Sequence, residues 1–141
     1  MIDATLQQIP ADCDQVGRLI QQARNHQQSA ARVVDGESAY ILLYSAVHKV
    51  LAAALLADGY RVGAGERGHV VLIQSVKERL GAEHATTLTR IDRGRRKRNK
   101  VAYESEAVSK GELDALSSNV ADTFKAVSAY IKERVPKEAS S

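Results

Sequence analysis

The sequence is poor in residues that interrupt helices and in those that form disulfides. Its 141 residues include two prolines, one phenylalanine, no tryptophan and a single cysteine, Cys13, which excludes an internal disulfide and a cysteine-cluster metal site. The longest apolar candidate, Val47 to Leu56, contains His48 and Lys49 and is far shorter than the ~18 residues of a membrane helix. The beginning of the sequence is polar and unlike a signal peptide. We therefore expect a cytoplasmic protein that makes no membrane contact.

The composition that remains is typical of an all-α protein, because good helix formers dominate it. Apolar residues recur at helical spacing and predict helices over 12–34, 37–58, 69–80 and 83–103. A capping box, Ser109 to Glu112, predicts the start of a fifth helix that ends before Pro136. We predict a single up-and-down bundle of about five helices.

Several segments carry weaker signals. Residues Ile2 to Ile9 are expected to form a short helical turn, and Val33 and Val34 are expected on the inner face of the first helix. The stretch 60–68 contains three glycines and predicts a flexible loop. It is not a phosphate loop, because no lysine followed by serine or threonine closes it. We predict one domain over residues 1–135 and a disordered polar tail over 136–141.

The most informative stretch is the basic end of the fourth helix. Its inner face is predicted to comprise Leu88, Ile91, Arg95, Arg98, Asn99 and Ala102. A guanidinium on such a face needs a carboxylate, phosphate or carbonyl, because an unpaired buried charge costs several kcal/mol. Arg95 and Arg98 are therefore predicted to face a buried or partner-facing surface.

The same helix concentrates positive charge. Seven lysines and arginines lie between Arg90 and Lys100, opposed only by Asp92. Such a cluster attracts phosphates, but a solvated helix face has the same composition. Both interpretations stay open for the exposed members of the cluster.

The histidines and tyrosines offer few catalytic patterns. None of the four histidines stands in a metal-ligand spacing, so we expect no metal and no other cofactor. His48 is expected to be a core histidine bonded to a neighbour, whereas His69 follows the glycine-containing loop, where an imidazole could touch a phosphate. Tyr103 lies five residues after Arg98 and can reach the same groove.

At Arg98-Asn99-Lys100-Val101-Ala102-Tyr103 the sequence resembles the HEPN superfamily of small helical-bundle domains. The family signature is an arginine, commonly followed by asparagine, then three variable residues and a histidine. A long second helix and the pair Gly68-His69 agree with the resemblance, which is clearest from Ser38 to Tyr103. It implies a homodimer of a prokaryotic toxin–antitoxin or defence system, with an arginine-lined cleft that binds RNA or a partner such as a nucleotidyltransferase.

One position departs from the family pattern. In nuclease-active members, arginine and histidine from two subunits meet at the dimer interface and cleave RNA, but here Tyr103 occupies the histidine position. A phenol, with an ordinary pKa of about 10, is a poor general base at neutral pH. The dimer and its cleft are therefore implied more strongly than catalysis.

Three functions follow as hypotheses. The first is a non-catalytic module in which Arg95, Arg98, Asn99, Tyr103 and His69 bind RNA or a partner. The second is a metal-independent endoribonuclease in which Arg98 stabilises the charge on the phosphate and Tyr103 or His69 moves the proton. The third is a helical scaffold whose basic helix pairs only with acidic residues of its own fold, such as Asp92, Glu104 and Glu106.

Overall fold

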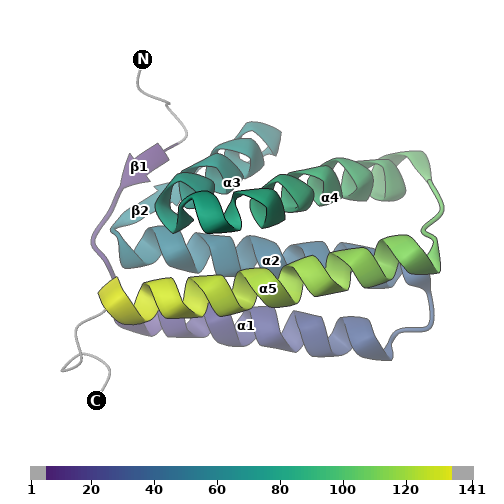
Figure 1. The fold of residues 1–141 in the computed structure, drawn as a ribbon, viewed down its shortest axis with the longest axis horizontal. Helices are drawn as coiled ribbons and strands as arrows, with labels where there is room; N and C mark the ends of the chain where they lie inside the picture. Colours follow the sequence, from purple (N-terminus) through teal and green to yellow (C-terminus); the bar gives the residue numbers. More distant parts are fainter. Residues whose placement is uncertain (1–5, 135–141) are drawn as a thin grey trace.

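The structure is a computed structural model that describes residues 6–134, and these form five α-helices and one small antiparallel sheet (Figure 1). The helices are α1 (Cys13–Arg32), α2 (Gly36–Ala57), α3 (Glu66–Leu80), α4 (Ala85–Glu104) and α5 (Lys110–Arg134). The strands are β1 (Leu6–Gln8) and β2 (Tyr60–Val62), and a 3-10 turn, η1 (Ala82–His84), joins α3 to α4. The predicted all-α bundle of about five helices is confirmed.

Helix α2 is the centre of the bundle. Figure 1 shows α1 and α5 running along its length, while α3 and α4 lie together over it on the opposite side from α1. The apolar residues that recur at helical spacing along α2 are buried throughout: Tyr40, Leu43, Tyr44, Val47, Leu51, Ala54 and Leu55. By length and composition alone α2 could cross a membrane, but 67% of its most apolar window is buried inside the structure. That burial is the pattern of a core helix, which is apolar on every side because other helices surround it.

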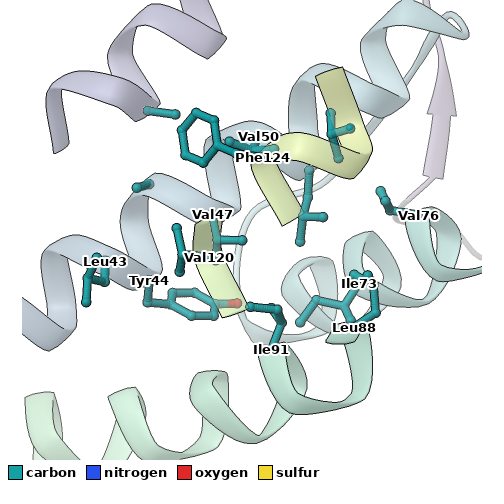
Figure 2. Close-up of a cluster of buried hydrophobic side chains, with 14 of the residues drawn as sticks. Leu43, Tyr44, Val47, Val50, Ile73, Val76, Leu88, Ile91, Val120 and Phe124 are labelled. Carbon is teal, nitrogen blue, oxygen red and sulfur yellow. The ribbon is translucent and has the colours of Figure 1, made fainter. Parts of the chain in front are cut away.

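One main hydrophobic core joins all five helices. Side chains from α2, α3, α4 and α5 interdigitate in it, among them Val47, Ile73, Leu88 and Val120 (Figure 2). Full burial of such a side chain contributes about 1.5–3 kcal/mol, so this core supplies most of the driving force for folding. At the end of α2, Asp58 accepts hydrogen bonds from Arg79 Nε (2.7 Å) and from the Tyr130 hydroxyl (2.5 Å), which ties α3 and α5 to it.

Short polar side chains cap the N-termini of three of the helices. Asp12 accepts hydrogen bonds from the backbone N–H groups of Asp14 and Gln15 at the start of α1, and Asp35 caps α2 in the same way. The predicted capping box of α5 is confirmed. The Glu112 N–H donates to Ser109 Oγ (3.1 Å), and the Ser109 N–H donates to Glu112 Oε1 (2.9 Å).

The expectations for the N-terminal turn and the middle loop were wrong where the structure describes them. Residues Leu6–Gln8 form strand β1, which pairs antiparallel with β2, so neither a helical turn nor a wholly irregular loop is present there. The pairing joins segments more than fifty residues apart, and local periodicity carries no signal for it. The chain enters β2 through Gly59, whose positive φ of 84° suits glycine. Residues 1–5 lie outside the described part.

Two assignments to the inner faces were also wrong. Helix α1 ends at Arg32, and Val33 and Val34 are exposed (38% and 102%), because the chain leaves the helix in extended conformation there. Near the end of α4, Val101 is buried where the prediction placed Ala102, and Ala102 is exposed. One residue is 100° of helical rotation, enough to move a side chain from the core to solvent. The predicted tail 136–141 lies outside the described residues.

Candidate functional site

Four of the five predicted site residues line one pocket between the start of α3 and the end of α4. The pocket has a volume of about 320 Å³, and we call it the Arg98 pocket; it is lined by Gly65, Glu66, His69, Arg98, Asn99 and Tyr103. His69 near the start of α3 and Arg98 near the end of α4 reach it from two consecutive helices. The fifth predicted residue, Arg95, is not part of its lining.

The first turn of α3 places His69 at the pocket. Helix α3 begins after Gly65, whose φ of +92° no other residue adopts readily. A Cβ at Gly68 would overlap the carbonyl oxygen of Gly63, so the preceding loop packs against the helix only because residue 68 is glycine. The His69 N–H then donates to the Gly65 carbonyl (3.2 Å), which fixes the histidine in the first turns of the helix.

His69 is held by two rings of α2. The hydroxyl of the buried Tyr44 lies 3.1 Å from His69 Nδ1, and the two rings stack with centroids 5.8 Å apart and planes inclined by 12°. The ring of His48 lies 4.3 Å from that of His69, centroid to centroid. The expectation of a hydrogen-bonded core histidine was wrong, because His48 is half-buried and meets Tyr44 and His69 through ring contacts. Within residues 6–134 it makes no hydrogen bond through its imidazole.

Arg98 lies across the same aromatic group. Its guanidinium carbon is 4.9 Å from the centre of the Tyr44 ring, a cation–π contact. Among the described residues, no carboxylate forms a salt bridge with Arg98. The aromatic face orients the guanidinium but leaves its N–H donors without an anionic partner. Arg98 is the half-buried cation of this pocket whose charge no carboxylate of residues 6–134 neutralises.

Burial and the Arg98 charge keep both histidines neutral. Burial lowers the pKa of His48 to about 4, helped by the neighbouring His69 and Arg98. Burial and then Arg98 also lower the pKa of His69. Burial raises the pKa of Tyr44 to about 12, so its hydroxyl keeps its proton at neutral pH. When that hydroxyl donates to Nδ1, the neutral His69 carries its own proton on Nε2.

Arg95 has a different role from Arg98. It is 7% exposed, and its guanidinium is hydrogen-bonded to Asp92 on α4 (Nε to Oδ1, 3.0 Å) and to Glu66 on α3. The prediction that Arg95 is buried is confirmed. Its charge is taken up by two carboxylates of the same chain, so it fastens α4 to α3 and does not line the Arg98 pocket.

Glu66 is the site residue that the sequence analysis missed. Its Oε2 accepts hydrogen bonds from both Arg95 and Asn99 Nδ2, the latter at 3.1 Å. The sequence signal that pointed to such a residue was the predicted burial of Arg95, because a buried guanidinium needs a carboxylate from another helix. The spacing of residues in the sequence does not identify that carboxylate. Asn99 is thereby fixed in orientation, and its Oδ1 is buried without a hydrogen-bond partner in the described chain. Tyr103, by contrast, is 79% exposed at the rim.

The basic cluster of α4 divides into paired and unpaired members. Arg96 pairs with Asp92 (3.4 Å), and Lys97 pairs with Glu106 (2.7 Å) and Glu112 (3.1 Å). Over residues 6–134, the cations of this cluster without a salt bridge are Arg90, Arg93, Arg98 and Lys100. Salt bridges within the chain therefore neutralise part of the basic cluster. Asp92 and Glu106 form such bridges, as the scaffold hypothesis expects. Glu104 forms no such pair in the described chain.

No protein-family model and no curated protein matches this sequence. Within the described part of the chain, no three histidine, cysteine, aspartate or glutamate side chains converge as metal ligands would. Function must therefore be argued from the chemistry of the Arg98 pocket.

Proposed function

We propose that this protein is a HEPN-like, cytoplasmic module that acts as a homodimer in a prokaryotic toxin–antitoxin or defence system and binds RNA through the Arg98 pocket. One observation carries the proposal. Arg98 is a half-buried guanidinium that no carboxylate of the described chain neutralises, and it shares a pocket with His69, Asn99 and Tyr103. An arginine oriented by a ring and left without a partner is suited to an external phosphate.

The other residues of the pocket suit a nucleotide. The neutral His69 adds an N–H donor beside the phosphate position without adding charge. The exposed ring of Tyr103 at the rim offers a face on which an unpaired base can stack, as aromatic side chains do in single-strand RNA recognition. The unpaired Lys100 raises the local positive potential and favours association with a polyanion.

The homodimer rests on the family resemblance and on the shape of the site. A single chain offers a small pocket with Tyr103 largely in solvent, whereas a second copy would double the number of unpaired cations and enclose the ring. In this arrangement Tyr103 forms a hydrogen bond across the dimer. The same face could bind a nucleotidyltransferase of the same operon, and competition between that protein and RNA would reveal it.

Binding of single-stranded RNA, followed by fluorescence anisotropy at several salt concentrations, tests the proposal. We expect Arg98→Gln to weaken binding about tenfold or more and to reduce the slope of log affinity against log salt. The matched control is Arg96→Gln on the same helix, whose guanidinium is 70% exposed and paired with Asp92. Equal affinities for the two variants would refute the proposal. The scaffold function would then remain, since it predicts that these substitutions lower only the stability of the protein.

A second candidate, a metal-independent endoribonuclease, is favoured by the contact of neutral His69 with Tyr44 beside Arg98. As general base, His69 would adopt the other tautomer, in which Nδ1–H donates to the Tyr44 hydroxyl and the free Nε2 takes the proton of a ribose 2′-hydroxyl. The resulting oxygen would attack the adjacent phosphorus, and the P–O5′ bond would break to give a 2′,3′-cyclic phosphate and, after protonation, a 5′-hydroxyl. Cleavage that survives chelators and is lost in both His69→Gln and Arg98→Gln would select this candidate over simple binding.

A further inference from the structure

A second basic pocket lies between α4 and α5. Its volume is about 350 Å³, and we call it the α4–α5 pocket. Arg90, Arg93, Gly94 and Lys97, at successive helical spacings on α4, form one of its walls, and Asn119 of α5 faces them. The two pockets share no residue and flank α4 on different sides, because the Arg98 pocket is closed by α3.

The floor of this pocket carries an unpartnered polar group. Tyr40 of α2 is 5% exposed and lines the pocket, but its hydroxyl makes no hydrogen bond within residues 6–134. A Cβ built on Gly94 would lie 3.0 Å from Leu116 Cδ1 and 3.7 Å from that hydroxyl, so the glycine lets Leu116 pack closely beside it. The hydroxyl oxygen is not fully enclosed by the described chain, so a ligand in the pocket can reach it. Burial raises the pKa of Tyr40, so the group is protonated and can donate.

The charges around the pocket favour an anion. Arg90 and Arg93 are exposed at its edge, and neither forms a salt bridge in the described part of the chain. Lys97 is bridged by Glu106 and Glu112, so the one carboxylate that lines the pocket, that of Glu112, is already neutralised. Two guanidinium charges therefore remain for a ligand.

We propose that the α4–α5 pocket binds the phosphate group of a small phosphorylated molecule, held between Arg90 and Arg93 with the Tyr40 hydroxyl donating to it. Two forked guanidinium groups and a hydroxyl match the three terminal oxygens of a phosphate monoester. The rest of the pocket, lined by Gly94, Ala115 and Leu116, leaves room for the rest of a molecule of about mononucleotide size. The 5′-phosphorylated end of an RNA presents the same chemistry.

Calorimetric titration of the full chain with AMP and with inorganic phosphate tests this site. We expect saturable binding of AMP that weakens about tenfold in Tyr40→Phe, the loss of one hydrogen bond to a charged group, and further in Arg93→Gln. Arg98→Gln, in the other pocket, should leave the affinity for AMP within about twofold of the wild type. The unfolding midpoint of Tyr40→Phe should not fall, since its hydroxyl has no protein partner.

A second titration separates the two sources of the phosphate. Short RNAs with a 5′-phosphate and with a 5′-hydroxyl are compared in the wild type and in Arg93→Gln. Binding that requires the 5′-phosphate and Arg93, without binding of AMP, supports the site and assigns it to an RNA end. The inference is overturned if AMP and phosphate fail to bind saturably and RNA affinity does not depend on the 5′-phosphate, or if Tyr40→Phe and Arg93→Gln both bind as the wild type does. RNA binding through Arg98 requires no 5′-phosphate, so this failure leaves the proposed RNA function untouched.

Discussion

The guanidinium carbon of Arg98 lies 4.9 Å from the centre of the Tyr44 ring, so one α2 residue orients the cation of the candidate site. The hydroxyl of the same ring lies 3.1 Å from His69 Nδ1. Tyr44 thus contacts both groups that a bound phosphate would meet. The face of its ring lies against Arg98, and its hydroxyl lies beside His69. Tyr44 is therefore both a buried core residue and a residue that orients the side chains of the pocket.

The first prediction separates these two contacts. Tyr44→Phe keeps the ring beneath Arg98 but removes the hydroxyl that meets His69, and we expect it to lower the free energy of unfolding by about 1–2 kcal/mol. RNA affinity should change less than about twofold, because Arg98 keeps its orientation. Urea denaturation measures the first quantity and anisotropy the second. The control is Tyr40→Phe, whose hydroxyl has no partner in the described chain, and an equal loss of stability in both variants would contradict the argument.

The second prediction concerns Arg95. Arg95→Ala removes a buried guanidinium and leaves Glu66 and Asp92 without its charge, so we expect a loss of about 2 kcal/mol in the free energy of unfolding. Arg96→Ala, at an exposed pair, should cost less than about 0.5 kcal/mol. At a temperature where Arg95→Ala is still folded, its RNA affinity should remain within about threefold of the wild type. A loss as large as that of Arg98→Gln would place Arg95 in the binding site after all.

A large part of this arrangement could be predicted from the sequence, because the relevant signals are local. The stripe of α2 and the capping box at Ser109 depend on residues within a turn or two of each other. Arg98, Asn99 and His69, which the family resemblance grouped as candidate binding residues, line one pocket. Whether this pocket binds RNA stays a prediction.

The features that could not be predicted from the sequence are contacts between distant segments. The β1–β2 pairing, the bond from Tyr44 to His69 and the choice of Glu66 as the partner of Arg95 all depend on how elements meet in space. Periodicity places a residue on a face of a helix but does not name what lies opposite. The error at Ala102 has another cause, since the buried residue at this end of α4 is Val101 and a shift of one position moves a side chain from the core to solvent.

The third prediction is a dependence of stability on pH. His48 has a folded pKa of about 4 against an ordinary value of 6.5, so the unfolded chain binds its proton first as the pH falls. Its contribution is fully present above pH 6.5 and is lost between pH 6.5 and 4. The loss reaches at most about 3 kcal/mol, since one pKa unit is worth about 1.4 kcal/mol. His69, whose pKa is lowered too, adds in the same direction.

Urea denaturation between pH 7.5 and 4 measures this dependence. The variant His48→Gln should show a flatter decline below pH 6.5 than the wild type, because its side chain does not titrate. The same substitution at His26, on α1 and away from the His48–His69 contact, should keep the decline of the wild type. Identical profiles for His48→Gln and the wild type would show that another group causes the acid sensitivity.

The last prediction tests whether Tyr103 limits the chemistry of the pocket. Tyr103 is 79% exposed, so Tyr103→His should leave stability unchanged within about 0.5 kcal/mol. It places a group with an ordinary pKa near 6.5 beside Arg98, where a phenol transfers protons poorly. We expect this variant to gain slow RNA cleavage that resists chelators and rises with pH through the titration of the new imidazole. The matched control is Arg98→Gln combined with Tyr103→His, which keeps the base but lacks the cation that stabilises the phosphate. Cleavage by both variants alike would show that the new histidine acts without Arg98 and that the two residues do not form one site.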